Sequence, residues 1–211
     1  IKTGKGLERF PDFVRGNLAT LLETREQRGI SGAAIRMMIV GVPNVGKSSL
    51  INQLAGGRRL RVEDRPGVTL RKQWIKVEGG MELLDMPGVL WPKFEDPLVG
   101  EKLGFTGAIK DDVMDTELLA IRLAVTLRDN YPAMLKNRYG FTQQDYDTLQ
   151  DYELVELLGR KRGMLISGGE IDFERASQTL LDEYRGGVLG RATLETPPIQ
   201  KEIQEKPKEQ E

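Results

Sequence analysis

The segment Gly41-Val42-Pro43-Asn44-Val45-Gly46-Lys47-Ser48 follows the pattern G-x-x-x-x-G-K-[ST]. Small residues let backbone N–H groups close around phosphate oxygens, and a helix that begins here adds positive potential. Lys47 can then reach the β- and γ-phosphates, and the hydroxyl of Ser48 can ligate Mg²⁺. A nucleoside triphosphate is therefore the predicted ligand. The predicted phosphate-binding residues are Pro43, Asn44, Val45, Gly46, Lys47, Ser48 and Ser49.

The sequence on either side of this segment predicts the elements that such a loop requires. Residues 35–40 form a short apolar run that ends at Gly41 and predicts a buried strand. A helix is expected over residues 47–55. A plain glycine turn between a strand and a helix is the alternative interpretation of the motif, and the strand–loop–helix context favours phosphate binding over it.

A second candidate metal ligand, Asp85, follows a predicted strand at residues 81–84. Another strand is expected at residues 73–77, and Glu78-Gly79-Gly80 between them favours a tight turn and antiparallel pairing. An Asp at the end of a strand can hold Mg²⁺ through water. The stretch Asp85-Met86-Pro87-Gly88 is a D-x-x-G motif, which is common and also fits an ordinary turn.

The order of these segments resembles that of P-loop GTPases. Asp85-Met86-Pro87-Gly88 corresponds to their switch II motif, and Thr69 in Arg65-Pro66-Gly67-Val68-Thr69 matches the switch I threonine that completes Mg²⁺ coordination. The resemblance implies GTP and GDP as ligands and disfavours an ATPase or a nucleotide kinase. It also implies the residue roles. The implied catalytic residues are Lys47, Thr69 and Gly88, the implied Mg²⁺ ligands are Ser48, Thr69 and Asp85, and Gly88 also contacts the nucleotide.

Asn44 matches the P-loop asparagine that ligates K⁺ in potassium-activated relatives, so the resemblance implies K⁺ as a further ion. A simple polar loop residue is the alternative interpretation of Asn44. In ordinary GTPases a glutamine can follow switch II, whereas Val89 stands here and cannot orient a water molecule. The resemblance implies that the group that completes catalysis lies outside this chain.

The guanine-reading motif Asn-Lys-x-Asp does not occur after Gly88, where an ordinary GTPase places it. Instead, the first seven residues resemble the segment that begins just after the Ser of the Ser-Ala-Lys guanine loop and leads into its helix. This order is that of circularly permuted GTPases. We therefore expect an N-terminally incomplete domain that starts inside the guanine loop and lacks about 100 upstream residues. Its sheet of three strands would have a bare edge and an uncovered apolar face.

Three later segments resemble the RbgA (YlqF) family in particular: residues 90–96 (LWPKFED), 106–111 (TGAIKD) and 162–169 (RGMLISGG). The resemblance covers about residues 1–196. It implies an α/β fold, a doubly wound P-loop GTPase sheet in circularly permuted order, followed by a small all-helical domain thought to contact ribosomal RNA. It further implies a factor in late assembly of the large (50S) ribosomal subunit, with the subunit precursor and its rRNA as partners.

Helical periodicity dominates after residue 112, with helices expected near residues 118–127, 153–162 and 173–184. We therefore expect three parts: residues 1–111, the C-terminal portion of the GTPase domain; residues 112–196, the helical RNA- or ribosome-contacting domain; and residues 197–211, a tail rich in Pro, Lys, Glu and Gln that is predicted to be disordered.

Charge restricts the ways in which this chain could contact RNA. Because 31 basic residues face 32 acidic ones, any contact must come from local clusters. Residues 56–76 hold seven basic and two acidic side chains, a net charge of +5 that suits phosphate backbones. A solvated basic face is the alternative interpretation. Arg160-Lys161-Arg162 is a weaker signal, because such residues can also complement a helix C-terminus.

Composition limits the other classes of function. The absence of Cys excludes disulfides and thiolate metal sites and fits a reducing, cytoplasmic location, and the absence of His excludes histidine acid–base chemistry within this chain. No apolar run approaches a membrane span, and neither membrane nor DNA is expected as a partner. Two alternative functions remain open: a catalytically silent fragment that binds RNA or a partner, and another P-loop GTPase that acts on RNA.

Overall fold

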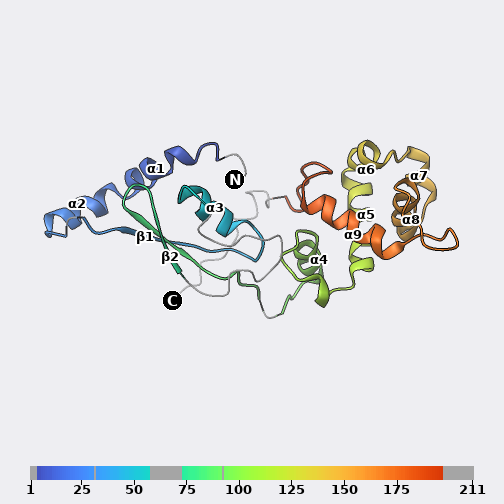
Figure 1. Cartoon of the computed structure of the whole chain (residues 1–211), viewed down its shortest axis with the longest axis horizontal. Coiled ribbons are helices and arrows are strands. Elements are labelled where there is room, and N and C mark those ends of the chain that lie inside the picture. The colour runs from blue at the N-terminus through green and yellow to red at the C-terminus, as the bar shows by residue number, and fades with distance from the viewer. Residues whose placement is uncertain (1–3, 31, 58–72, 92, 197–211) are drawn as a thin grey trace, which may run out of the picture. The chain divides into compact units, whose positions relative to one another are not determined.

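The computed structural model describes residues 4–30, 32–57, 73–91 and 93–196 of the 211-residue chain (Figure 1). Two compact units, residues 1–119 and 120–211, are described separately below. The predicted tail 197–211, Thr69 and most of the basic cluster at residues 56–76 lie outside the described residues. None of the described helices is both long and apolar enough to cross a membrane.

The first unit combines a small sheet with helices. Its elements are η1 (Leu7–Arg9), α1 (Phe10–Asn17), α2 (Ala19–Gln27), β1 (Ile35–Ile39), α3 (Lys47–Leu54), β2 (Gln73–Val77), β3 (Met81–Asp85), α4 (Pro97–Phe105), η2 (Asp111–Val113) and the beginning of α5 (Thr116–Asn130). The division between the units falls within α5, whereas the sequence placed the end of the GTPase domain at residue 111.

The sheet has the strand order β1-β3-β2. β1 pairs in parallel with β3, and β2 pairs with β3 in antiparallel register, with Val77 opposite Met81. Gly79 and Gly80 in the connecting turn have φ values of 79° and 70°, which L-residues other than glycine rarely adopt. The predicted strands and their hairpin are confirmed.

One face of the sheet is covered by α1 and α3. Alternation along the strands places Ile35, Met81 and Val77 on the same face. Val14 of α1 packs against the buried residues Ile35 and Met81. Farther along the strands, a second cluster joins Ile51 of α3 to Leu83 of the central strand, and Ile51 is 0% exposed. The core therefore lies between this face and the two helices, which confirms the α/β class.

On the opposite face of the sheet, polar and apolar side chains alternate with no described helix packed over them. Met38 is 56% exposed and Trp74 is 48% exposed. Arg36 spans this face, because its Nε lies 3.0 Å from a Glu82 carboxylate oxygen and its guanidinium carbon lies 5.2 Å from the Trp74 ring centroid. The sequence predicted an uncovered apolar face, whereas this face of the described sheet also carries the ion pair between Arg36 and Glu82.

Apolar residues recur at helical spacing over residues 7–22, but the structure has η1 followed by two helices and not one continuous helix. Leu18 leaves helical geometry at φ −109° and ψ 12°, directly after Gly16 and Asn17, which are poor helix formers. Pro11 lies in the first turn of α1, where a proline is tolerated. Arg15 ties α1 to the sheet because its Nη2 donates to the Gly79 carbonyl at 2.6 Å.

The second unit is helical. It contains most of α5, then α6 (Pro132–Tyr139), α7 (Gln143–Thr148), α8 (Asp151–Lys161) and α9 (Phe173–Arg185). Its core is aliphatic, and these side chains are at most 1% exposed: Leu123, Leu127, Leu135, Leu154, Val155, Leu158, Leu180 and Leu181. The helices predicted from periodicity in this region are confirmed, and a further helix, α6, begins at Pro132.

Candidate phosphate-binding site

The loop between β1 and α3 bends through two left-handed residues. Asn44 has φ 58° and is the only non-glycine residue with positive φ among those described. Gly46, with φ 91° and ψ 21°, is the N-cap of α3. Left-handed residues in a turn line up successive backbone N–H groups, and the amino end of a helix adds positive potential. This arrangement is suited to binding an anion. Ser49, another predicted phosphate-binding residue, lies in the first turn of α3.

Lys47, the first residue of α3, is only 9% exposed. Its ammonium folds back onto the loop and donates to the Val42 carbonyl at 2.8 Å. Burial lowers the pKa of Lys47, and the nearby charge of Asp85 partly opposes this effect. A buried ammonium with one carbonyl partner gains strongly from an incoming anion, because its lost hydration is then replaced by charge-assisted hydrogen bonds.

Ser48 and Asp85 meet beneath the loop. The Ser48 hydroxyl donates to Oδ2 of Asp85 at 3.2 Å, although 37 positions separate the two residues in the chain. Asp85 is 1% exposed because alternation along β3 places it on the helix-covered face with Met81 and Leu83. The parallel pairing of β1 with β3 brings Asp85 opposite Ile39, the last residue before the loop.

Two oxygen donors of this kind fit Mg²⁺, which usually takes one or two protein oxygens and completes its shell with water and phosphate oxygens. Within the part of the chain that is described, no group of three or more acidic, His or Cys residues could hold a metal by itself. Ser48 and Asp85 would therefore hold Mg²⁺ together with a bound phosphate.

Gly88 lies against the phosphate-binding loop. A Cβ placed on Gly88 would come within 2.5 Å of both Cα and N of Pro43, and within 2.9 Å of the carbonyl carbon of Val42. Only a glycine allows this approach, since the atoms it meets belong to the backbone. The segment after β3 therefore lies directly beside the phosphate-binding loop. Within that loop, the side chain of Val45 is turned toward solvent and is 54% exposed.

The structure thus brings two chain segments together: residues 43–48, with Pro43, Lys47 and Ser48, and residues 85–88, with Asp85 and Gly88. Sequence reasoning did not identify the Val42 carbonyl as the partner of Lys47, since a backbone acceptor carries no residue signal. Nor did it identify the close contact of Gly88 with Pro43, which depends on how the segment after β3 packs.

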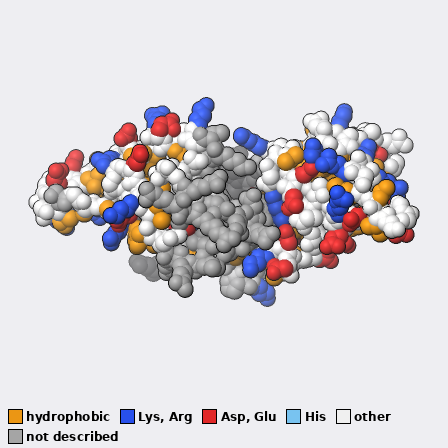
Figure 2. Space-filling view, in the orientation of Figure 1, with side chains coloured by type: hydrophobic (Ala, Val, Ile, Leu, Met, Phe, Trp, Pro, Cys, Tyr) orange, Lys and Arg blue, Asp and Glu red, His pale blue; other side chains and the backbone are white. Residues whose placement is uncertain are grey.

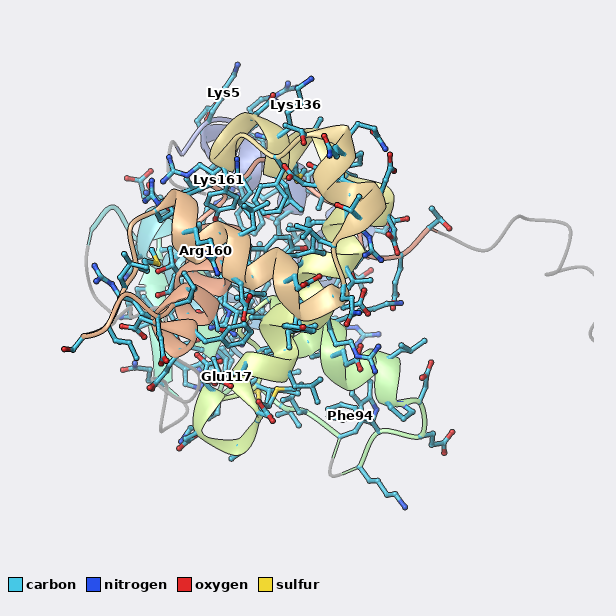
Figure 3. All side chains as sticks on the ribbon, turned by 90° about the vertical axis from the view of Figure 1, so that its right-hand side faces the viewer. Lys5, Phe94, Glu117, Lys136, Arg160 and Lys161 are labelled. Atoms are coloured by element: carbon cyan, nitrogen blue, oxygen red, sulfur yellow. The ribbon has the colours of Figure 1, made fainter. Side chains whose placement is uncertain are left out.

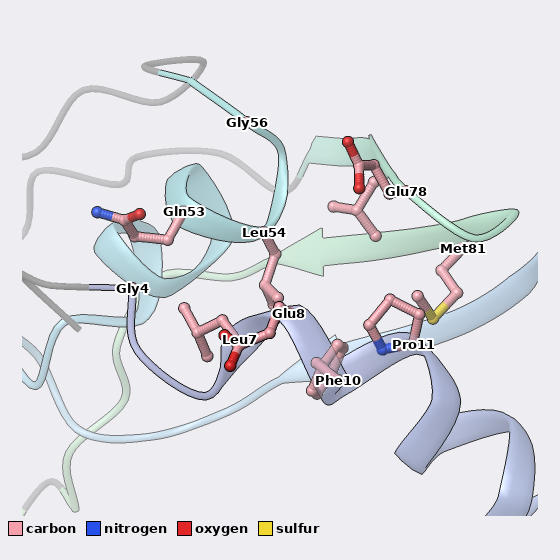
Figure 4. A pocket seen from close by; sticks show the side chains of 11 residues that line it. Gly4, Leu7, Glu8, Phe10, Pro11, Gln53, Leu54, Gly56, Glu78 and Met81 are labelled. Atoms are coloured by element: carbon pink, nitrogen blue, oxygen red, sulfur yellow. The ribbon is translucent and has the colours of Figure 1, made fainter.

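A separate cavity lies at the opposite end of α3 from Lys47. It has a volume of about 210 Å³ and is lined by the last turn of α3, the start of α1 and the β2–β3 hairpin, including Gln53, Phe10 and Met81 (Figure 4). Its walls come from helix and strand ends that are remote from the loop. This cavity does not contribute to the phosphate site.

The fold and the site define a P-loop nucleotide-binding protein: a strand, a glycine loop and a helix present a lysine and a hydroxyl beside a buried Asp at the end of the neighbouring strand. The family described as 50S ribosome-binding GTPase matches residues 36–161. This range includes the loop, Asp85, and helices α4 to α8.

Individual relatives agree with the family match. Ribosome biogenesis GTPase A of Bacillus cereus is 44% identical over 196 residues, which cover 93% of this chain and 65% of the relative. Ribosome biogenesis GTPase A of Bacillus pumilus is 42% identical over 194 residues, covering 92% of this chain and 68% of the relative. The solved GDP-bound structure of TM YlqF is 29% identical with a TM-score of 0.52, covering 82% of this chain and 65% of that one.

The chain therefore belongs to the 50S ribosome-binding GTPase family, within its ribosome biogenesis GTPase A group. It spans about two thirds of the length of the relatives it matches, 65% and 68% for the two Bacillus proteins. The similarity to RbgA-type proteins that the sequence motifs indicated is confirmed.

Proposed function

We propose that this protein is a Mg²⁺-dependent GTPase that acts as an assembly factor for the large ribosomal subunit. The observation that carries the proposal is the contact between Ser48 and Asp85 beside the buried Lys47, in a chain of this family. The proposed cellular location is the cytoplasm, where bacterial subunits are assembled.

Each residue of the site has a proposed role. Lys47 exchanges its Val42 partner for the β- and γ-phosphates, and Ser48 and Asp85 hold Mg²⁺, with Asp85 acting through water. Gly88 places its backbone beside the γ-phosphate position, next to the loop. Thr69, which is outside the described residues, completes the metal shell. K⁺ bound near Asn44 would supply positive charge in the transition state.

The second unit supplies a surface for ribosomal RNA. The C-terminal turns of α6 and α8 lie together, since the Lys161 ammonium donates to the Gly140 carbonyl at the end of α6, at 2.9 Å. We call the cations of these two turns the basic surface. It consists of Lys136, Arg138, Arg160, Lys161 and Arg162.

Glu183 organises part of this basic surface. Arg138 donates to Glu183 through Nε at 2.7 Å, Arg162 donates at 3.2 Å, and the Tyr139 hydroxyl donates at 2.8 Å. These hydrogen bonds, that of Arg138 above all, hold the pKa of Glu183 below its ordinary value. One carboxylate thus orients two guanidiniums, and the five cations of the basic surface outnumber it.

Lys136 and Arg160 form no ion pair within the described part of the chain and remain available for phosphates. Figure 2 shows Lys and Arg side chains over the part of the second unit that contains α6 and α8. Figure 3 shows Lys136, Lys161 and Arg160 along one side of that unit. Clustered cations on a rigid surface are the usual means of binding a nucleic acid backbone. We therefore assign the proposed rRNA contact to this surface.

GTP hydrolysis measured with and without large ribosomal subunits tests the proposal. We expect the subunits to stimulate turnover by wild-type protein and Lys47→Ala to abolish it. If the protein co-sediments with subunits but hydrolyses no GTP, it is a silent binding fragment instead.

Binding to subunit precursors tests the partner. The basic cluster at residues 56–76 is proposed as a second contact, so charge reversal at Arg58, Arg59 and Arg61 should weaken co-sedimentation and reduce its salt dependence. Reversal of Arg25 and Arg28 in the first unit changes net charge without altering this cluster and serves as the control. Equal binding by the two variants across a salt series would show that the cluster at residues 56–76 is a solvated basic face.

A further inference from the structure

A short hairpin joins α8 to α9 next to the basic surface. Its two sides pair through Leu165 and Ile171, and the Asp172 N–H donates to the Met164 carbonyl at 2.9 Å. The Ile166 N–H donates to the Glu170 carbonyl, also at 2.9 Å. The backbone of the hairpin is therefore held in one conformation.

The base of the hairpin is anchored in the helical core. Met164 is 6% exposed, and Ile171 packs so closely on α8 that a Cβ at Gly159 would lie 2.7 Å from its Cγ2 atom. At the tip, Gly168 and Gly169 have φ values of 97° and 81° and allow the tight reversal. The hairpin is thus a rigid projection.

Two adjacent aliphatic side chains, Leu165 and Ile166, lie in water on this projection. They are 51% and 48% exposed. Exposed single aliphatics are common in proteins, but a neighbouring pair held on a rigid turn indicates a contact surface. The cations Arg160, Lys161 and Arg162 immediately precede the hairpin in the chain. The partner must therefore offer negative charge and an apolar surface within a few residues of each other.

RNA with unpaired bases has both properties. A regular A-form helix presents phosphates, but its base faces are stacked and its major groove is too deep and narrow for side chains. Bulges and internal loops expose base faces beside the backbone, and Leu or Ile side chains are used elsewhere as wedges between unstacked bases. Charge complementarity with the basic surface favours this partner over an apolar protein segment.

We propose that Leu165 and Ile166 form a wedge that packs against unstacked bases of RNA whose phosphates lie on the basic surface. The second unit then binds bulged or looped RNA in preference to continuous duplex. This proposal depends on the proposed function in one respect, namely that the second unit contacts RNA.

The test uses the full 211-residue chain and two synthetic 16-base-pair RNA duplexes, one with a central two-nucleotide bulge and 2-aminopurine beside it. Fluorescence anisotropy gives the affinities, and 2-aminopurine fluorescence reports unstacking. Wild-type protein should prefer the bulged RNA by about tenfold, which corresponds to about 1.4 kcal/mol, and should raise the fluorescence.

The variant Leu165→Ser with Ile166→Ser should lose the preference and the fluorescence change, yet keep its affinity for the continuous duplex. Because both side chains are half-exposed, its urea unfolding midpoint should match wild type. Leu98→Ser with Val113→Ser removes two comparably exposed aliphatics of the first unit and should retain the preference. Lys136→Glu with Arg160→Glu should weaken binding to both RNAs.

A wild-type protein that binds both RNAs equally, or neither, overturns the proposal, and so does a hairpin variant that keeps the preference. If the hairpin variant loses subunit binding while its RNA preference is unchanged, the wedge contacts a protein instead. These titrations need no GTP hydrolysis, so their failure is distinguishable from failure of the proposed GTPase function.

Discussion

Adding one methyl group at Gly88 tests how closely the segment after β3 must approach the phosphate-binding loop. The new Cβ would lie 2.5 Å from backbone atoms of Pro43, whereas ordinary contacts begin at 3.4 Å. The two segments must therefore separate by about 0.9 Å. Backbone atoms cannot rotate away as a flexible side chain does, so the displacement changes the position of Gly88 itself.

This displacement is large compared with the range of a hydrogen bond. A backbone N–H of Gly88 that donates to a γ-phosphate at about 2.9 Å would move beyond about 3.5 Å, where little of the bond remains. A hydrogen bond to a charged group contributes about 1.5–3 kcal/mol. Gly88→Ala should therefore weaken the binding of a non-hydrolysable GTP analogue by about 10- to 150-fold. GDP has no γ-phosphate, so its affinity should change less than about twofold.

Calorimetric titrations of GTPγS and GDP with Mg²⁺ measure both effects. Gly16→Ala is the matched control, because a Cβ at Gly16 meets no atom within 4 Å. It should bind both nucleotides like wild type. Unchanged GTPγS affinity in Gly88→Ala would show that the close approach is absent in the nucleotide-bound protein. An equal loss for GDP would show that the loop itself is distorted, and would refute the selective effect.

Four further predictions follow from the described contacts. Lys47→Ala should abolish triphosphate binding, and calorimetry showing wild-type affinity would exclude the phosphate role of Lys47. Ser48→Ala should remove the tightening of GTP binding by Mg²⁺ with the fold intact, so a preserved difference between Mg²⁺ and EDTA would count against the metal site. Asn44→Gly should eliminate any advantage of KCl over NaCl in subunit-stimulated hydrolysis without straining the left-handed backbone at φ 58°, and a wild-type K⁺ response would exclude Asn44 as a K⁺ ligand. Because hydrogen bonds hold the pKa of Glu183 below its ordinary 4.5, they stabilise the fold above that pH and the stabilisation is lost as pH falls through the lower, folded-state value. Urea unfolding should therefore show Glu183→Gln less stable by about 1–2 kcal/mol at pH 7, with the difference shrinking in strong acid, whereas a pH-independent difference would contradict this origin.

Local structure in this chain could be predicted from the amino-acid sequence alone. The strand–loop–helix at residues 35–54 and the β2–β3 hairpin depend on apolar runs and on glycine at left-handed positions. These signals act over a few residues, since a turn or a helical hydrogen bond joins near neighbours. The break at Leu18 is local as well, because it depends on small differences in helix propensity that the apolar spacing does not show.

The chemistry of the phosphate loop could likewise be predicted from residue types. A lysine and a hydroxyl residue that follow a glycine loop between a strand and a helix are typical of phosphate binding. The sequence also identified Asp85 as a candidate metal ligand. It could not show that the Ser48 hydroxyl lies 3.2 Å from Asp85, which requires β1 to pair with β3 and α3 to cover that face.

Only the tertiary structure decided the contacts between distant segments. The backbone of Gly88 lies close to that of Pro43. Arg138 donates a hydrogen bond to Glu183, which is 45 residues away in the chain. The hairpin that exposes Leu165 and Ile166 could be seen only once its pairing and burial were known. Such contacts arise from the packing of whole elements against one another, and the residue types at a contact do not specify which distant partner the packing will bring to them.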